Sequence, residues 1–359
     1  MSTEAPSSAR RADEQRPLAA EGAATAARTP TRPVFIAGPD RSGTTLLFAL
    51  LASHPNISMV RRTNMFRYFH RRYGDLRDPQ NLERCLADML RYRRMGHLRP
   101  DGERIRREFL LGEPTYGRLF ALFHEHHAER AGKARWGDKS LHTEHHADQV
   151  FAEFPDARIL HMVRDPRDRY ASVRKRHGQD LSRVGAATGR WLDSTRAARR
   201  NVARYPGRYL IVRYEDIARD PQSTMRHVCD FLGEDYSTVM LSMEGVPDHR
   251  GSGNSSFGDV EPGAVSTRAI GRFRSVLSPS EIAFIELIVG RDMDSLGYER
   301  AEAELSFPSR LRFSAWDFPF QFARMIGWMT SARWRRSRQA PAPAARRRDE
   351  GAQEAPGTT

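Results

Sequence analysis

The residues best suited to chemistry form a loop that begins at Gly38 and ends at Thr45. An apolar run typical of a buried strand, residues 34–37, precedes this loop, and residues 44–52 follow with the apolar spacing of a helix. Backbone N–H groups in such a loop converge on an anion, and the positive end of the helix dipole adds to the attraction. The predicted phosphate ligands are Arg41, Ser42, Gly43, Thr44 and Thr45.

The loop lacks the lysine that nucleoside triphosphatases place just before the final hydroxyl residue. Thr44 occupies that position, and the cation of the loop is Arg41 instead. A triphosphatase uses the lysine on the terminal phosphates and the hydroxyl on Mg²⁺. We therefore expect a shorter 5′-phosphate ester as ligand, and a P-loop kinase-like phosphotransferase is the alternative.

A second basic segment, residues 164–172, follows another apolar run at residues 157–163. The Asp-Pro pair after Arg164 is typical of a helix start, so Arg164 ends a strand and Ser172 lies on the next helix. Open α/β sheets bind ligands at this edge. The segment predicts a clamp on a second phosphate, and a network of surface ion pairs is the alternative.

Strands and helices alternate along the chain. Residues 209–212 predict a strand, and Asp-Pro at 220–221 and Ser-Pro at 278–279 predict helix starts. The predicted fold is α/β, a P-loop-like three-layer arrangement with a central parallel sheet flanked by helices. Residues 60–135 are arginine-rich with helical spacing and predict a helical insertion that shapes the acceptor site.

Composition divides the chain further. Residues 1–32 and 339–359 predict disordered tails. Residues 33–300 contain all the motifs and predict one domain, within which the Gly-, Ser- and Pro-rich residues 245–263 predict a mobile loop. Residues 301–338 predict a helical C-terminal segment rich in aromatic and basic side chains.

Together, the two phosphate segments resemble those of the sulfotransferases that use 3′-phosphoadenosine 5′-phosphosulfate (PAPS). In that family the loop corresponding to Pro39–Thr45 binds the 5′-phosphosulfate, and the residues corresponding to Arg164 and Ser172 bind the 3′-phosphate. The interval between Arg164 and Ser172 matches the family pattern. The arginine form of the first loop looks like that of tyrosylprotein and many bacterial members. The resemblance implies sulfuryl transfer from PAPS without a metal.

Two further segments extend the resemblance over roughly residues 33–300. Val212–Asp216 is similar to a strand-end Tyr-Glu-Asp whose tyrosine, Tyr214 here, lies near the adenine. Residues 270–274 resemble a late basic motif that reaches the donor, which implies cofactor contacts for Arg272 and Arg274.

Sulfuryl transfer requires cations on the leaving phosphate and a base beside the acceptor hydroxyl or amine. Arg41 is placed for the leaving group. Lys139 looks like the lysine that family members carry between the two phosphate motifs, and it is one of three lysines among 58 basic residues. We expect both side chains to be catalytic.

The base is less clearly marked. Tyrosylprotein-like relatives place a glutamate after the first helix, but residues 58–64 contain no carboxylate. His142 is the leading candidate because cytosolic relatives use a histidine close to such a lysine and because histidine has a suitable pKa. Asp138 and His70 are the alternatives.

The net charge of +13 favours anionic partners. The arginines are spread along the chain without a recognised nucleic-acid motif, so we expect no nucleic-acid binding, although a basic nucleic-acid-binding protein is the non-enzymatic alternative. The acceptor is expected to be a small molecule, a lipid or a glycan. Histidine clusters at residues 124–127 and 142–146 show no spacing of a known metal site, and no metal is expected.

Residues 307–334 contain eight aromatic side chains, and arginines follow them. We expect this segment to pack back on the domain, and peripheral contact of residues 313–338 with an anionic membrane is the alternative. The chain lacks an apolar stretch long enough for a membrane span. We expect the protein to lie in the cytoplasm or at the inner face of the membrane. Its two cysteines are compatible with the reducing environment of the cytoplasm.

Overall fold

The computed structural model describes residues 32–140, 142–181, 183–246, 264–301 and 303–337. The expected disordered tails, apart from Arg32, lie outside the described residues. Most of the expected mobile loop, from residue 247 to residue 263, also lies outside them.

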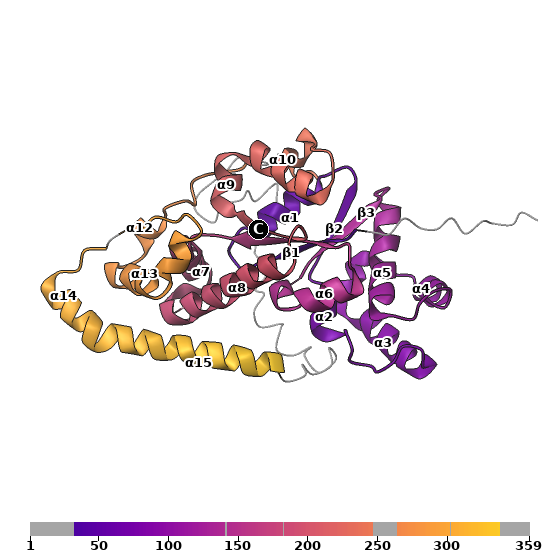
Figure 1. Cartoon of the computed structure of the whole chain (residues 1–359), viewed down its shortest axis with the longest axis horizontal. Helices are drawn as coiled ribbons and strands as arrows, with labels where there is room; N and C mark the ends of the chain where they lie inside the picture. Colours follow the sequence, from indigo (N-terminus) through magenta and orange to yellow (C-terminus); the bar gives the residue numbers. More distant parts are fainter. Residues whose placement is uncertain (1–31, 141, 182, 247–263, 302, 338–359) are drawn as a thin grey trace, which may run out of the picture. The chain divides into compact units, whose positions relative to one another are not determined.

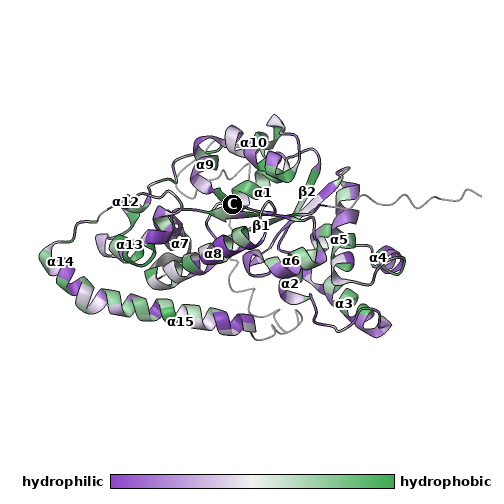
Figure 2. Ribbon diagram, viewed as in Figure 1, coloured by the Kyte–Doolittle hydropathy of each residue, from purple (hydrophilic) through white to green (hydrophobic). Residues whose placement is uncertain are grey.

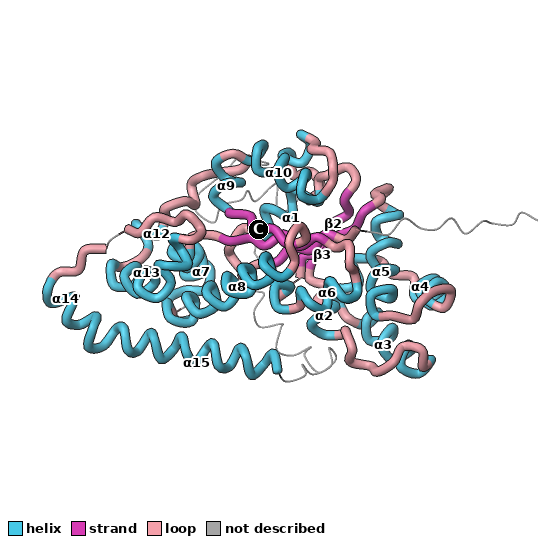
Figure 3. Tube along the Cα trace, in the orientation of Figure 1, coloured by secondary structure: helices cyan, strands magenta, loops and turns pink. Residues whose placement is uncertain are grey.

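A five-stranded parallel sheet lies at the centre of the fold, with helices around it (Figures 1 and 3), as predicted. The strand order is β2-β3-β1-β4-β5, so β1 lies between β3 and β4. Strands β2 and β3, which follow β1 in the sequence, lie on one side of β1, and strands β4 and β5 lie on its other side. The strands are β1 (Val34–Ala37), β2 (Ile57–Arg61), β3 (Arg135–Lys139), β4 (Arg158–Val163) and β5 (Tyr209–Arg213).

Helices account for most of the remaining described residues. On the first half of the chain they are α1 (Thr44–Ala52), α2 (Met65–Tyr68), α3 (Pro79–Arg91), η1 (Arg93–Leu98), α4 (Gly102–Phe109), α5 (Tyr116–Arg130), η2 (Thr143–His145) and α6 (Ala147–Glu153). On the second half they are α7 (Pro166–Leu181), α8 (Val184–Arg204), α9 (Tyr214–Arg219), α10 (Pro221–Leu232), η3 (Thr238–Ser242), α12 (Phe273–Val276), α13 (Pro279–Asp294), α14 (Phe307–Arg312), η4 (Phe313–Asp317) and α15 (Phe318–Ser337).

The sheet is buried on both faces, as expected for parallel strands. Val34 and Ile36 pack in one apolar core with α1, α8, α10 and α13. Phe35 and Ala37 point the other way, into a second core that contains side chains of α3, α4, α5 and α6. The expected helical insertion is therefore the layer that covers one face of the sheet, and α2 to α5 lie within it.

Strand β3 differs from the prediction, which assigned no strand between residues 60 and 156. The sequence of β3, Arg-Trp-Gly-Asp-Lys, lacks the apolar run of a buried strand. Its two buried charged side chains have partners inside the protein, because Arg135 donates to Glu234 at 2.9 Å and Asp138 accepts from Thr63 at 2.9 Å. Tertiary hydrogen bonds thus compensate for a pattern that does not indicate a strand.

The C-terminal segment packs back on the domain, as expected. Helix α15 lies along α8 (Figure 1), and a Cβ atom at Gly185 of α8 would clash with the backbone of Gln321. At the far end of α15, Arg336 makes two hydrogen bonds to the carboxylate of Asp193, at 2.7 and 3.0 Å. Among the described residues, no helix is both long enough and apolar enough to cross a membrane.

Candidate functional site

The loop between β1 and α1 is shaped by two glycines. Gly38 and Gly43 have φ angles of +120° and +89°, which other residues rarely adopt. A Cβ atom at Gly38 would clash with the Met162 carbonyl oxygen, and one at Gly43 would lie 2.5 Å from the ring of Tyr214. The loop can therefore approach β4 and Tyr214 closely only with glycine at both positions.

Asp40 fixes the loop to the helices beneath it. Arg169 on α7 donates to the Asp40 carboxylate at 2.7 Å and to its carbonyl at 2.9 Å, and Arg190 on α8 donates to the carboxylate at 3.1 Å. Burial would raise the pKa of Asp40, but the two guanidinium groups hold that pKa well below its usual range. Asp40 therefore remains ionised and holds the loop in place.

The two predicted phosphate segments meet in space. Arg41 Nε donates to Ser172 Oγ at 3.0 Å, and Arg164 Nη1 donates to the Arg41 carbonyl at 3.3 Å. Arg164 lies at the carboxyl end of β4, next to β1 in the sheet, which explains the contact. The structure thus joins the loop after β1 and the segment after β4 into one basic site.

Buried polar atoms at this site have no partner within the described part of the chain. They include Ser42 Oγ, Arg164 Nε and Tyr214 Oη. Arg164 also lies 4.4 Å above the Tyr214 ring, and Trp191 Nε1 holds the Arg164 carbonyl at 2.8 Å. Because buried polar groups are normally hydrogen-bonded, these atoms are suited to a bound phosphorylated nucleotide.

The late basic motif is attached to the same place. Asp168 on α7 accepts from the backbone N–H groups of Gly271 at 2.6 Å and Phe273 at 2.8 Å. Arg164 Nη2 donates to the Ala269 carbonyl at 2.7 Å. Arg272 and Arg274 are exposed on this turn, so the structure brings their backbone to the site while their side chains face solvent.

Lys139 reaches the first turn of α1 from the end of β3. Its Nζ donates to Thr45 Oγ1 at 2.9 Å. Burial lowers the pKa of Lys139 to about 7, and Arg62 and Arg61 contribute to the same shift by charge repulsion. The ammonium group is thus beside the phosphate loop, where an anionic ligand would favour its protonated form.

The three candidate bases occupy different environments. His142 is exposed on the turn after β3, with a φ angle of +64°. Asp138 precedes Lys139 on the strand and so points to the opposite face of the sheet, where Ser140 Oγ donates to it at 2.6 Å and burial raises its pKa to about 6. His70 lies in the helical layer, bonded to Glu153 at 2.7 Å. Of these three side chains, only that of His142 is exposed.

The histidine clusters have partners in the protein. His124 bonds to the Phe120 carbonyl at 2.8 Å and stacks on Trp136. In the second cluster, ligand atoms of His142, Glu144 and His145 lie within 4.8 Å of one another. Glu144 accepts from Ser194 at 2.9 Å, and His145 lies 3.1 Å from Asp193. These contacts give the second cluster a structural role in joining η2 to α8.

Several site residues were not identified from the sequence. The Asp40 carboxylate accepts from Arg169 and Arg190, and Asp168 accepts from the backbone of the late basic motif. Arg190 lies on α8, a helix that the prediction did not include. Arg169 belongs to the second basic segment, but the sequence does not distinguish its role from that of Arg167. The structure separates them, because Arg167 binds Asp165 at 2.6 Å, away from the loop, while Arg169 binds Asp40.

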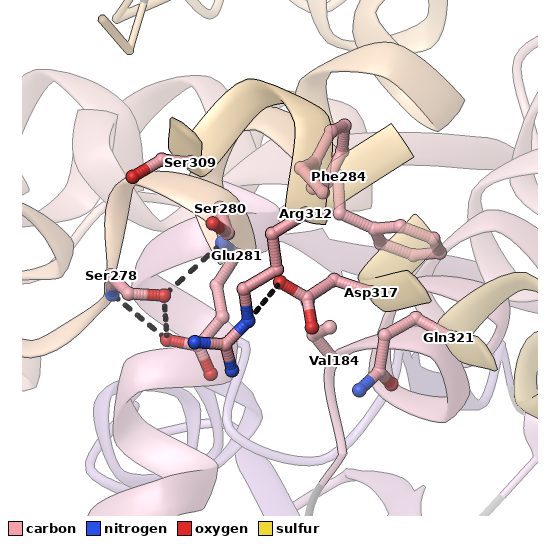
Figure 4. Close-up of a pocket in the computed structure, with 10 residues that line it drawn as sticks. Val184, Ser278, Ser280, Glu281, Phe284, Ser309, Arg312, Asp317 and Gln321 are labelled. Carbon is pink, nitrogen blue, oxygen red and sulfur yellow. Dashed lines mark hydrogen bonds and ion pairs between the residues drawn. The ribbon is translucent and has the colours of Figure 1, made fainter. Parts of the chain in front are cut away.

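A cavity of about 350 Å³ lies elsewhere, between the start of α13 and the α14–η4 segment (Figure 4). Glu281 in its wall accepts from Arg174 at 2.7 Å and from Tyr170 at 2.9 Å. Across the cavity Arg312 and Asp317 form an ion pair of 3.6 Å. None of the residues predicted to bind the donor lines this cavity.

Comparisons with known proteins agree with this geometry. Carbohydrate sulfotransferase 2 of Mus musculus is 36% identical over 104 residues, which cover 27% of this chain and 18% of that protein. Carbohydrate sulfotransferase 1 of Danio rerio is 28% identical over 170 residues, 40% of this chain and 38% of that protein. The chain thus matches less than two fifths of the length of either relative.

The sulfotransferase domain of the Synechococcus PCC 7002 olefin synthase has the same fold, with a TM-score of 0.52 and 22% sequence identity. The similarity covers 76% of this chain and 96% of that domain. The model of the sulfotransferase family matches residues 33–238, which is more than half of the chain and includes both phosphate segments. The chain belongs to the sulfotransferase family.

Proposed function

We propose that the protein transfers a sulfuryl group from PAPS to a hydroxyl group of an acceptor. The main support for this proposal is the contact between Arg41 and Ser172, because it joins two predicted anion sites that are far apart in the sequence. A nucleotide with phosphates at both the 5′ and 3′ positions matches two adjacent cationic sites. Family membership supports the same donor.

Each residue of the basic site has a role in this proposal. The loop amides, Ser42 and Thr45 bind the 5′-phosphosulfate, while Arg164 and Ser172 bind the 3′-phosphate. Tyr214 lies beside the adenine, and Arg272 and Arg274, which are exposed on the late basic motif, are available to contact the donor. These assignments use the buried atoms that have no partner within the described residues, Arg164 Nε and Ser42 Oγ among them.

Arg41 and Lys139 stabilise the charge that develops as the adenosine bisphosphate leaves. Arg41 extends from the loop itself, and Lys139 approaches from β3 through Thr45. Fixed cations at a partly buried site lower the barrier because they require little reorganisation during the reaction. His142 accepts the proton of the acceptor hydroxyl, since it is exposed and lies on the turn that follows β3 and Lys139.

A carbohydrate hydroxyl is the acceptor that we favour. This choice is supported by two relatives that are named carbohydrate sulfotransferases and are 36% and 28% identical to parts of the chain. The helical layer formed by α2 to α5 covers the sheet face next to β2 and β3 and is the surface most suited to shape an acceptor site.

The test is a transfer assay with sulfur-labelled PAPS, the purified protein and a panel of mono- and oligosaccharides, with simple phenols and amines as comparison acceptors. We expect label in a carbohydrate product together with an equal amount of adenosine bisphosphate. Transfer to phenols alone would change the acceptor class but keep the reaction. Absence of transfer to any acceptor, combined with stabilisation by ATP–Mg²⁺ rather than by adenosine bisphosphate, would favour the phosphotransferase alternative.

A further inference from the structure

The C-terminal helices expose an unusual share of apolar surface. Of the 13 large apolar side chains that are exposed within the described residues, seven lie between residues 307 and 334. We name this set the C-terminal apolar face: Phe307, Leu311, Trp316, Phe320, Phe322, Ile326 and Trp334. Trp316 is 72% exposed and Phe307 is 80% exposed. A concentration of this kind marks an interaction surface.

The exposed face is not the result of a loosely attached helix. The opposite side of α15 is buried against α8 through Met325 and Ala332, and Gly185 allows the two backbones to approach closely. The ion pair between Arg336 and Asp193 fixes the end of the helix. The domain therefore holds α15 in a defined orientation and turns the apolar face outward.

The charge around this face is predominantly positive. Between Phe307 and Ser337 the sequence has six arginines and a single acidic residue, Asp317. That carboxylate lies in the wall of the α13–α14 cavity and pairs with Arg312 (Figure 4). Figure 2 shows the apolar residues along α14 and α15, with the hydrophilic ones gathered at the C-terminal end of α15. Exposed aromatic residues flanked by arginines are typical of helices that lie in a membrane interface.

We propose that the C-terminal apolar face binds the surface of an anionic lipid bilayer, with Phe320 and Trp316 in the interface and the arginines at the headgroups. A second copy of the chain is less suited to this face, because a two-fold contact would bring arginines against arginines. Anionic headgroups match both the apolar stripe and the positive charge.

Membrane binding at this face would hold the basic site close to the bilayer. The Trp328 ring of α15 lies 5.4 Å from the guanidinium of Arg190, which in turn holds Asp40 of the phosphate loop. Arg336 also lies 3.4 Å from His145 on the turn that carries His142. The proposal about the membrane does not depend on the identity of the reaction.

The test is sedimentation of the full chain with vesicles of phosphatidylglycerol and phosphatidylcholine, and with vesicles of phosphatidylcholine alone. We expect binding to the anionic vesicles that weakens as salt is added. The paired variant Trp316→Ser/Phe320→Ser should bind at least about tenfold more weakly, because two large side chains no longer enter the interface. The matched control is Leu110→Ser/Leu111→Ser, whose side chains are 69% and 80% exposed elsewhere on the molecule, and it should bind like the wild type.

A second pair of variants tests the charge. Arg324→Gln/Arg333→Gln should weaken binding roughly 30-fold, since each arginine near an anionic surface contributes about 1 kcal/mol. Arg77→Gln/Arg91→Gln, with side chains 75% and 72% exposed, is the control and should have little effect. Thermal melts followed by circular dichroism show that each variant is folded.

Three outcomes would overturn the proposal. One is equal binding to both kinds of vesicle, or binding to neither. Another is an equal loss in the control pairs, which would indicate nonspecific adhesion. The third is a dimer in sedimentation velocity that Trp316→Ser/Phe320→Ser dissociates, which would assign the face to a second copy of the chain.

Discussion

Arg41 Nε donates a hydrogen bond of 3.0 Å to Ser172 Oγ, across 131 residues of sequence. The contact places the cation of the loop after β1 against the helix that follows β4. A single ligand with two anionic groups can therefore contact both segments. The proposed reaction depends on this arrangement more than on any single residue type.

Arg41 is the first residue to test. Arg41→Ala should lower kcat by roughly 10² to 10³-fold, the usual cost of losing one donor to a developing negative charge. Steady-state kinetics at saturating PAPS would measure the effect. Arg77→Ala, which removes an arginine that is 75% exposed elsewhere, is the control. An unchanged kcat in Arg41→Ala would remove this arginine from the reacting centre.

Lys139 should make donor binding depend on pH. Burial lowers the pKa of Lys139 to about 7, so the ammonium group is lost as the pH rises through this value. Affinity for adenosine bisphosphate should fall roughly tenfold from about pH 6 to about pH 8, because a charged hydrogen bond is lost. Calorimetric titrations of the wild type and of Lys139→Arg would test this. The arginine stays protonated, so a similar pH dependence in Lys139→Arg would contradict the assignment.

Asp40 should stabilise the fold in a pH-dependent manner. Its pKa is lowered in the folded state, so its contribution is present above its unfolded pKa of about 4 and is lost as the pH falls toward the folded value. Asp40→Asn should lower the free energy of unfolding by roughly 2 kcal/mol at neutral pH, since Arg169 is left buried with a weaker partner. Urea unfolding at neutral and at acidic pH would measure this. Asp75→Asn, whose side chain is 62% exposed, is the control. A difference that persists at acidic pH would show that the cause is not the carboxylate charge.

His142 and Asp138 can be separated by their kinetics. His142→Gln should lower kcat by roughly 10² to 10⁴-fold, the range for a general base, with the affinity for adenosine bisphosphate unchanged. Asp138→Asn should act on the fold instead, because its carboxylate accepts from Thr63 and Ser140 on the opposite face of the sheet from Lys139. Kinetics and thermal melts of both variants decide between them. A loss of kcat in Asp138→Asn without a change in stability would transfer the role to the aspartate.

The sequence was sufficient for the motifs that depend on local pattern. The strand–loop–helix unit at residues 34–52 follows from an apolar run, two glycines and helical spacing. The helix start at Ser278, with Glu281 as its capping-box partner, is likewise a local signal, and the structure confirms it. Both are fixed by interactions within a few residues.

Other parts could not be predicted because tertiary contacts determine them. Strand β3 carries Arg135 and Asp138 inside the sheet, and only partners distant in sequence make this possible. Within the second basic segment, three arginines of one chemical type have different functions. Arg164 faces the site, Arg169 holds the phosphate loop, and Arg167 binds Asp165 and Glu286.

The most direct measurement is calorimetric titration with 3′,5′-adenosine bisphosphate and with adenosine 5′-monophosphate, in the wild type and in Arg164→Ala. If both anion sites bind one nucleotide, the wild type should prefer the bisphosphate by roughly 10- to 100-fold, the value of one or two charged hydrogen bonds. Arg164→Ala should lose most of that preference while it binds the monophosphate almost unchanged. Equal affinity of the wild type for both nucleotides, or an equal loss for both in Arg164→Ala, would contradict the account.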